Sequence, residues 1–303
     1  MEMTSHDLQR TNEELFSKKH ISPTISEYLT SEPLIVGKIN QGVELLTEWL
    51  AKDDWYESKQ ARLNQLKDID LEELVIKVYT SMAYHVVPET FVSASSIMAA
   101  FLTFSDHADS IKTVAEIIAI LAETDMYDLF RKEEGGTFYV VSNLDLPETL
   151  RNRIARCRYL PPMVCPPEEI RKNWNSAYLT FNDGIVLGRN KTHGGDLCLD
   201  VINTQNQVEL KLDLDFLCSV EEEPSPSRVL DTPEKQQNWD TFKFDSYATY
   251  EMIAHSGNRF YIPNKLDSRG RMYAQGYYIT PQGTAFKKAQ LEFAKEEYLE
   301  GMP

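Results

Sequence analysis

The chain has 303 residues, of which 42% are hydrophobic and 26% charged, enough for one large or two small domains with a substantial core. No apolar run approaches the about 18 residues of a membrane-spanning helix, and the N-terminal segment MEMTSHDLQR lacks the pattern of a signal peptide. The net charge of −16 argues against nucleic-acid binding by the surface as a whole, because contacts with phosphates dominate such binding.

Helical patterns dominate the first 157 residues. The apolar spacing predicts a short helix within residues 1–20 and helices over 39–66, 93–104, 110–130 and 147–157. Asp70 is expected to cap a further helix that runs through Tyr79, with Glu72 and Glu73 in its first turn. After the Gly135–Gly136 pair, β-branched and aromatic residues predict a strand over 137–141.

The composition and the hydrophobic pattern change at Tyr159, where prolines, glycines and short alternating runs become frequent. These runs predict small strands over 178–181, 185–187 and 197–202. A helix is expected within 210–220, with Asp213 as its N-cap, and another over 247–255. Residues 221–240, which contain Pro-Ser-Pro-Ser, are expected to be a linker.

Cysteine and histidine spacing favours no metal site. The four cysteines form no CxxC pair and are expected to be reduced thiols with a structural role: Cys157, Cys165, Cys198 and Cys218. The six histidines are scattered without the spacing of metal ligands. We therefore expect no structural metal, and His193 is expected to be a loop or packing residue.

The segment Asp267-Ser268-Arg269-Gly270-Arg271 carries the most specific chemistry. Its glycine lets the backbone approach a ligand closely, and each arginine offers a planar fork of donors that suits phosphate oxygens. Asp267 is close enough in sequence to orient either guanidinium. Between residues 258 and 288, six Lys and Arg residues face one Asp, a local charge of +5 (six minus one). An isolated motif of this kind is most often a surface turn with a salt bridge.

Several further motifs stand in a fixed order around this segment. They are Leu160-Pro161-Pro162-Met163-Val164-Cys165-Pro166-Pro167, Lys191-Thr192-His193, Asn203 and Gln205-Asn206 followed by Leu210-Lys211-Leu212-Asp213 and Phe216-Leu217, Phe260-Tyr261-Ile262-Pro263, Tyr273-Ala274, Pro281-Gln282-Gly283 and Lys287-Lys288. Together they resemble the single-subunit, phage-type RNA polymerases, over roughly residues 158–295. In that family two metal-binding aspartates and a fingers helix follow these motifs, and the sequence stops before either. The resemblance therefore implies the N-terminal subunit of a split polymerase, similar to the heterodimeric enzymes of N4-like podoviruses.

The helix and strand patterns predict an α+β, mainly helical fold, which the resemblance divides into four parts. These are a helical N-terminal domain (1–157), a connector of strands and loops leading into a shortened thumb-like helical segment (158–220), the linker (221–240) and the first part of a polymerase palm (241–303). It implies no catalytic residue in this chain. It implies a nucleic-acid-binding set made of Asp267, Arg269, Gly270, Arg271, Tyr273 and Lys288.

The implied partners are a second chain that carries the catalytic aspartates and binds Mg²⁺, the DNA template and the RNA product. The implied location is the cytoplasm of an infected bacterial host. The second chain is expected to cover residues 260–300, including Phe286 and Leu291. Two other interpretations stay open. One is a nucleic-acid-binding accessory protein derived from such a polymerase but without a catalytic partner, and the other is an unrelated interaction protein whose motifs match by chance.

Overall fold

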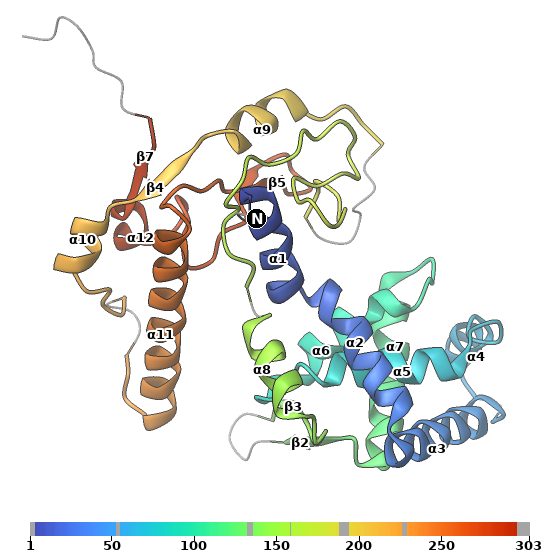
Figure 1. The fold of residues 1–303 in the computed structure, drawn as a ribbon. Coiled ribbons are helices and arrows are strands. Elements are labelled where there is room, and N and C mark those ends of the chain that lie inside the picture. Colours follow the sequence, from blue (N-terminus) through green and yellow to red (C-terminus); the bar gives the residue numbers. More distant parts are fainter. Residues whose placement is uncertain are drawn as a thin grey trace, which may run out of the picture. The chain divides into compact units, whose positions relative to one another are not determined.

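The computed structural model describes residues 4–52, 55–131, 136–157, 159–187, 194–225 and 229–295. About half of the chain is helical, and the strands form small antiparallel sheets, so the expected α+β, mainly helical class is confirmed (Figure 1). The backbone separates into two compact units. We call Lys18–Ala155 the helical unit, and Met1–Ser17 with Arg156–Pro303 the composite unit.

The helical unit packs its helices around an apolar core that follows the sequence periodicity. Ile21, Ile25 and Leu29 recur every four residues along one face of a helix and are fully buried. The same core contains Tyr79, whose hydroxyl bonds to the hydroxyl of Thr124 at 2.8 Å. Its helices are α2 (Lys18–Ser31), α3 (Pro33–Leu50), α4 (Glu57–Asn64), α5 (Leu71–Met82), α6 (Phe91–Met98), α7 (His107–Leu121) and α8 (Glu148–Arg156, whose last residue lies across the boundary), with single 3₁₀ turns at Ala99–Phe101 and Ala122–Thr124.

A three-stranded antiparallel sheet completes the helical unit. It has the order β1 (Glu89–Thr90), β3 (Phe138–Ser142), β2 (Tyr127–Arg131). The expected cap is confirmed, because the Asp70 carboxylate accepts the N–H of Glu73 at 3.1 Å. The strand expected over 137–141 is also confirmed as β3. The helix expected over 110–130 is too long: it ends near Leu121, and Asp125 adopts a left-handed conformation that turns the chain into β2.

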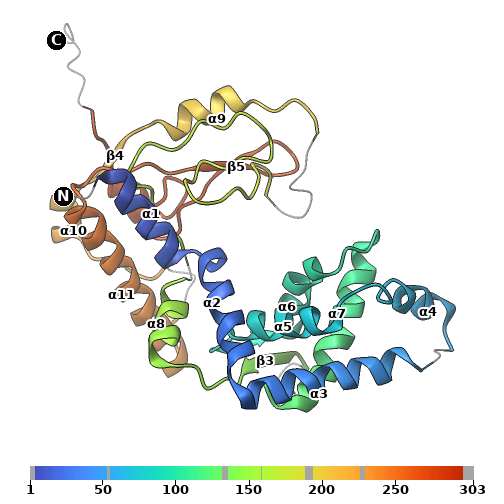
Figure 2. The same cartoon turned by 45° about the vertical axis from the view of Figure 1, so that its right-hand side comes forward.

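The composite unit combines small strands with helices of very different length. Its elements are α1 (Ser5–Phe16), α9 (Leu199–Asn206), β4 (Leu210–Leu212), α10 (Leu214–Ser219), α11 (Pro233–His255), β5 (Asn264–Leu266), β6 (Met272–Ala274), α12 (Ala285–Ala289) and β7 (Leu291–Phe293). The strands pair antiparallel as β4–β7 and β5–β6. Figure 2 shows α11 as a straight helix that projects from the strand-containing part of this unit. Its core includes Tyr250, Ile253, Phe260, Ile262 and Ile279.

The N-terminal helix α1 belongs to the composite unit, although the sequence placed residues 1–17 with the helices that follow. The reason is a set of buried polar contacts. Gln9 accepts the N–H of Val164 at 2.9 Å, and the Glu13 carboxylate accepts the N–H groups of Leu179 and Thr180 at 3.0 and 2.8 Å. Both side chains are almost completely buried. Helical spacing alone could not show what this face of α1 binds.

Three further expectations in the second half are wrong in part. Residues 178–181 form no strand, because Ser176 closes a compact loop by donating from its hydroxyl to the carbonyl of Phe181 at 2.6 Å. The run 197–202 enters helix α9 instead of a strand. Residues 233–240 of the expected linker are the first turns of α11. The helix expected within 210–220 is confirmed as α10, which Asp213 caps and which begins at Leu214, after β4.

Within the described ranges, no helix is both long enough and apolar enough to cross a membrane.

Candidate nucleic-acid interface

The Asp267–Arg271 segment is the turn of a short β-hairpin. Strands β5 and β6 pair with Leu266 opposite Met272, so the five residues between them form the connection. The N–H of Gly270 donates to the carbonyl of Asp267 at 2.9 Å, and the N–H of Asp267 donates to the carbonyl of Arg271 at 2.9 Å. Gly270 has φ +78°, a left-handed conformation that favours glycine. The motif therefore encodes a defined turn.

Asp267 organises this turn from the inside. One oxygen of its carboxylate accepts the backbone N–H groups of Arg269 and Arg271, both at 2.9 Å. The other oxygen accepts the Nε–H of Arg271 at 2.7 Å and lies 2.6 Å from its second guanidinium nitrogen. The Asp267 side chain is 17% exposed, whereas those of Arg269 and Arg271 are 71% and 53% exposed. The carboxylate thus lies within the turn while both cations face outward.

These contacts fix the charge state of the turn. The backbone N–H of Arg271 is the main reason why the pKa of Asp267 is lowered to about 2, and the Arg271 guanidinium adds to the effect. The same pairing raises the pKa of Arg271. The Arg271 guanidinium also lies 5.6 Å from the ring centre of Tyr273, within reach of a cation–π contact. Asp267 is therefore surrounded by four other expected site residues, namely Arg269, Gly270, Arg271 and Tyr273.

A third strand-like segment holds the hairpin in place. The N–H of Leu187 donates to the carbonyl of Leu266 at 2.7 Å, and the N–H of Leu266 donates to the carbonyl of Ile185 at 2.9 Å. Lys265, on the neighbouring position of β5, forms an ion pair with Asp183 at 2.5 Å, and its side chain is 9% exposed. Residues 185–187 were expected to be a strand, and they form a single parallel bridge at Val186.

Asparagine side chains hold the loops around the hairpin by hydrogen bonds to backbone groups. The Asn206 side-chain oxygen accepts the backbone N–H of Asn264 at 2.8 Å, and the Asn203 amide both donates to and accepts from the backbone of Ile170 at 2.9 Å. Asn258 makes the same two-way contact with Leu212, also at 2.9 Å. The Asn- and Gln-rich motif of residues 203–207 therefore has a structural role in this chain, which its residue types alone did not reveal.

The Pro281-Gln282-Gly283 turn clamps the free side of β6. The Gln282 side chain accepts the N–H of Ala274 at 2.9 Å and donates to the carbonyl of Met272 at 3.1 Å. It thereby supplies the hydrogen bonds that a neighbouring strand would make. Sequence reasoning noted this turn but missed the role of Gln282. Gln282 could have been found because its amide has both a donor and an acceptor and it lies in the turn that follows β6.

The Pro-rich segment of residues 160–167 is also joined to the site. Met163 and Tyr261 exchange backbone hydrogen bonds at 2.9 and 2.8 Å, and Met163 and Cys165 are buried. Burial raises the pKa of the Cys165 thiol to about 11. Cys157 is buried as well, whereas Cys198 and Cys218 are exposed. Residues 191–193, including His193, lie outside the described residues.

The tertiary structure reduces the basic character expected for residues 258–288. Arg259 pairs with Glu209 at 2.8 Å, and Lys265 pairs with Asp183. Lys287 is 8% exposed, and burial lowers its pKa. Four cations of the segment remain exposed: Arg259, which is paired with Glu209, and Arg269, Arg271 and Lys288.

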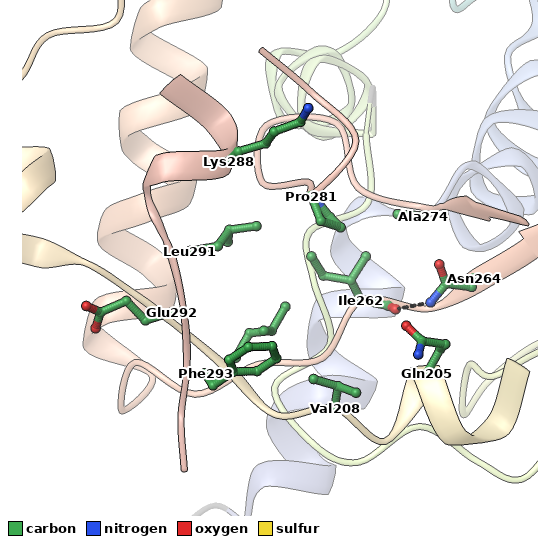
Figure 3. Close-up of a pocket in the computed structure, with 11 residues that line it drawn as sticks. Gln205, Val208, Ile262, Asn264, Ala274, Pro281, Lys288, Leu291, Glu292 and Phe293 are labelled. Atoms are coloured by element: carbon green, nitrogen blue, oxygen red, sulfur yellow. Dashed lines mark hydrogen bonds between the residues drawn. The ribbon is translucent and has the colours of Figure 1, made fainter. Parts of the chain in front are cut away.

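Lys288 lies apart from the turn, on α12, at the rim of a pocket of about 340 Å³. Ala274, next to Tyr273 in β6, lines the same pocket (Figure 3). The other lining residues are Gln205, Val208, Leu210, Ile262, Asn264, Pro281, Leu291, Glu292 and Phe293. The structure thus brings together five of the six expected residues and places the sixth at a neighbouring pocket.

The arrangement can bind anions through outward-facing guanidinium groups on a rigid turn. No group of three or more His, Cys, Asp or Glu side chains is placed to hold a metal ion within the described ranges. Comparison with known protein families finds none that matches the chain. A search of curated proteins likewise finds no match.

Proposed function

We propose that this chain is the template- and hybrid-holding subunit of a split DNA-directed RNA polymerase, and that it completes the active site of a second, catalytic chain. The observation that carries the proposal is the Asp267–Arg271 turn. Its carboxylate orients Arg271 through the Nε–H at 2.7 Å and leaves the Arg271 side chain 53% exposed. A cation held in this way can meet a phosphate without first losing side-chain freedom.

The turn suits recognition of the nucleic-acid backbone. Contacts with phosphate and sugar fix the position of a strand without reading its sequence, which is what a polymerase needs as its hybrid advances. Arg269 and Arg271 supply donors for phosphate oxygens, and Gly270 presents a backbone without a Cβ, which has open space around it. Tyr273 sits beside Arg271 and can contact the sugar.

The remaining parts of the proposal follow the order of the motifs. Residues 241–303, which contain the hairpin and β7, would be the first part of the palm. Helix α10, only six residues long, would be the shortened thumb-like segment. The catalytic aspartates and their Mg²⁺ would belong to the partner chain, because two-metal phosphoryl transfer requires carboxylates in those positions. This chain alone is expected to synthesise no RNA.

Co-purification decides between this proposal and an accessory nucleic-acid-binding protein. The chain is expressed with a candidate second chain that carries the catalytic aspartates, and the purified assembly is tested in primer extension. A complex that extends RNA supports the proposal. A chain that binds single strands but neither assembles nor extends is an accessory protein, and RNA synthesis by this chain alone contradicts the split-enzyme assignment.

Arg271→Ala tests the turn itself. We expect the complex to assemble normally and to extend RNA poorly on all template sequences alike. Loss of one phosphate contact should also reduce the slope of log binding constant against log salt concentration by roughly 0.7–0.9. Arg271→Lys is expected to restore little, since an ammonium lacks the planar fork, and Asp267→Ala is expected to act more mildly. Arg171→Ala is the matched control, because Arg171 is 77% exposed and also pairs with a carboxylate, that of Glu169. Normal extension by Arg271→Ala, or a defect in assembly alone, contradicts the assigned role.

A further inference from the structure

Strand β7 has one open edge. Within the described part of the chain, β7 has a strand neighbour, β4, on one side only. Strand β4 is covered on both sides, since Leu210 also exchanges backbone hydrogen bonds with Phe260 at 2.9 Å. An unpaired edge presents a row of N–H and C=O groups that can pair with another strand.

The pairing register shows which groups face outward. The N–H of Asp213 donates to the carbonyl of Gln290, and the N–H of Ala294 donates to the carbonyl of Glu209, at 2.9 and 3.0 Å. Lys211 lies opposite Glu292 between these pairs. In an antiparallel ladder the backbone groups of successive residues point to opposite sides. Gln290, Glu292 and Ala294 therefore face β4, and the backbone groups of Leu291 and Phe293 face away from it.

The side chains of Leu291 and Phe293 point to a single pocket. Figure 3 shows both directed into the space that Ile262, Pro281 and Val208 also border. The pocket of about 340 Å³ is at the small end of the range for ligand sites, roughly 300–1,000 Å³. A volume of this kind accommodates one apolar side chain beside the strand edge.

Among the described residues, one charge at the rim of the pocket has no counter-charge. Lys288 is exposed, and no described carboxylate pairs with its ammonium. Glu292, the acidic residue of the lining, is already paired with Lys211 at 3.2 Å. The rim therefore complements a carboxylate that comes from elsewhere.

We propose that β7 is the docking edge for an extended segment of a partner polypeptide. The segment adds a strand to β7 by pairing with Leu291 and Phe293, inserts an apolar side chain into the pocket, and places an Asp or Glu against Lys288. Strand addition of this kind derives its affinity from backbone hydrogen bonds and its specificity from pockets for alternate side chains. The identification of the partner with the catalytic chain rests on the proposed function, whereas the docking mode does not.

The backbone edge favours a strand over the other occupants. A helix satisfies its own backbone groups and would leave those of Leu291 and Phe293 unpaired. A nucleic acid could meet Lys288 through a phosphate, but it would neither fill an apolar pocket nor complete a β-ladder. An extended peptide matches all three features.

Selection from a library of short random peptides displayed on their own messenger RNA tests this directly against the full chain. We expect the selected peptides to share an apolar residue followed two positions later by Asp or Glu, because side chains on one face of a strand alternate. Methylation of alternate backbone nitrogens in a selected peptide is expected to abolish binding in one register and spare it in the other.

Variants of the full chain locate the site. Phe293→Asp and Lys288→Glu are each expected to weaken a selected peptide by at least about tenfold. Phe244→Asp is the matched control, because Phe244 on α11 is 74% exposed and Phe293 is 70% exposed. The control is expected to bind the peptide normally.

Several results would overturn the docking mode. These are a selection that yields no binder, binding that is unaffected by Phe293→Asp, and binding that is insensitive to backbone methylation. Self-association that Phe293→Asp abolishes would make the occupant a second copy of this chain. If Lys288→Glu reduced binding of single-stranded RNA and left peptide binding intact, Lys288 would belong to the nucleic-acid surface. The assay contains no catalytic chain, so its failure is distinct from a failure of the proposed function in primer extension.

Discussion

Replacing Gly270 by alanine should loosen the Asp267–Arg271 turn without creating a clash. An ideal Cβ at Gly270 meets no atom within 4 Å, so only the backbone conformation, φ +78°, opposes the change. A left-handed conformation costs an L-residue about 1–2 kcal/mol. Local opening of the turn should therefore become about 5–30 times more frequent.

Hydrogen exchange measures this change where it occurs. In the regime in which exchange reports the opening equilibrium, peptides that cover residues 264–275 of the Gly270→Ala variant should exchange faster by that factor. The amides of Arg269 and Arg271, which donate to Asp267, are the sensitive probes. Gly270→Asn should cost less, because asparagine tolerates this conformation better than alanine does.

Two other glycines test whether the expected cost of Gly270→Ala comes from the backbone conformation alone. Gly37, in helix α3, also has open space where a Cβ would lie but an ordinary backbone conformation, so Gly37→Ala should stabilise α3 by roughly 0.5–1 kcal/mol. At Gly276 a Cβ would lie 1.9 Å from the carbonyl oxygen of Ile279, so Gly276→Ala should be more damaging than Gly270→Ala. Unchanged exchange over residues 264–275 in Gly270→Ala would refute the proposed turn conformation.

Three further predictions concern the same unit. The pKa of Asp267 is lowered to about 2 from an ordinary 3.8, so the contribution of the Asp267 carboxylate to folding stability should be complete above pH 4 and be lost as the pH falls through 2. NMR titration of the Asp267 carboxyl carbon should give a midpoint near 2. A midpoint near 3.8 would contradict the contacts. Gln282→Leu removes both hydrogen bonds to β6 and should destabilise this strand by about 0.5–1.5 kcal/mol. Gln282→Glu keeps the acceptor for Ala274, but its second carboxylate oxygen would face the carbonyl of Met272, so this variant should also destabilise the strand. Equal exchange at Ala274 in all three proteins would argue against the clamp. Burial raises the pKa of Glu222, and its Oε2 has no hydrogen-bond partner among the residues that the structure describes, so Glu222→Gln should raise the melting temperature at pH 7. This gain should shrink as the pH falls through the raised pKa, and a lower melting temperature at pH 7 would show that the charge is needed.

The sequence by itself determined those features that depend on neighbouring residues. Helix periodicity and the cap at Asp70 follow from interactions within a few positions, and so does the turn built around Asp267 and Gly270. The α+β class followed from the same local patterns. These interactions close over at most four residues, so the sequence contains all of the groups involved.

The tertiary structure decided which groups meet across long separations. The burial of Gln9 and Glu13 against residues 164–180 placed α1 in the composite unit, and Asp183 and Glu209 neutralised two cations that local counting had left free. The clamp by Gln282, the open edge of β7 and the pocket beside Lys288 also arise only when separate segments pack together. The physical reason is that a polar side chain can satisfy its hydrogen bonds with many partners, and only the packing of the chain selects one of them.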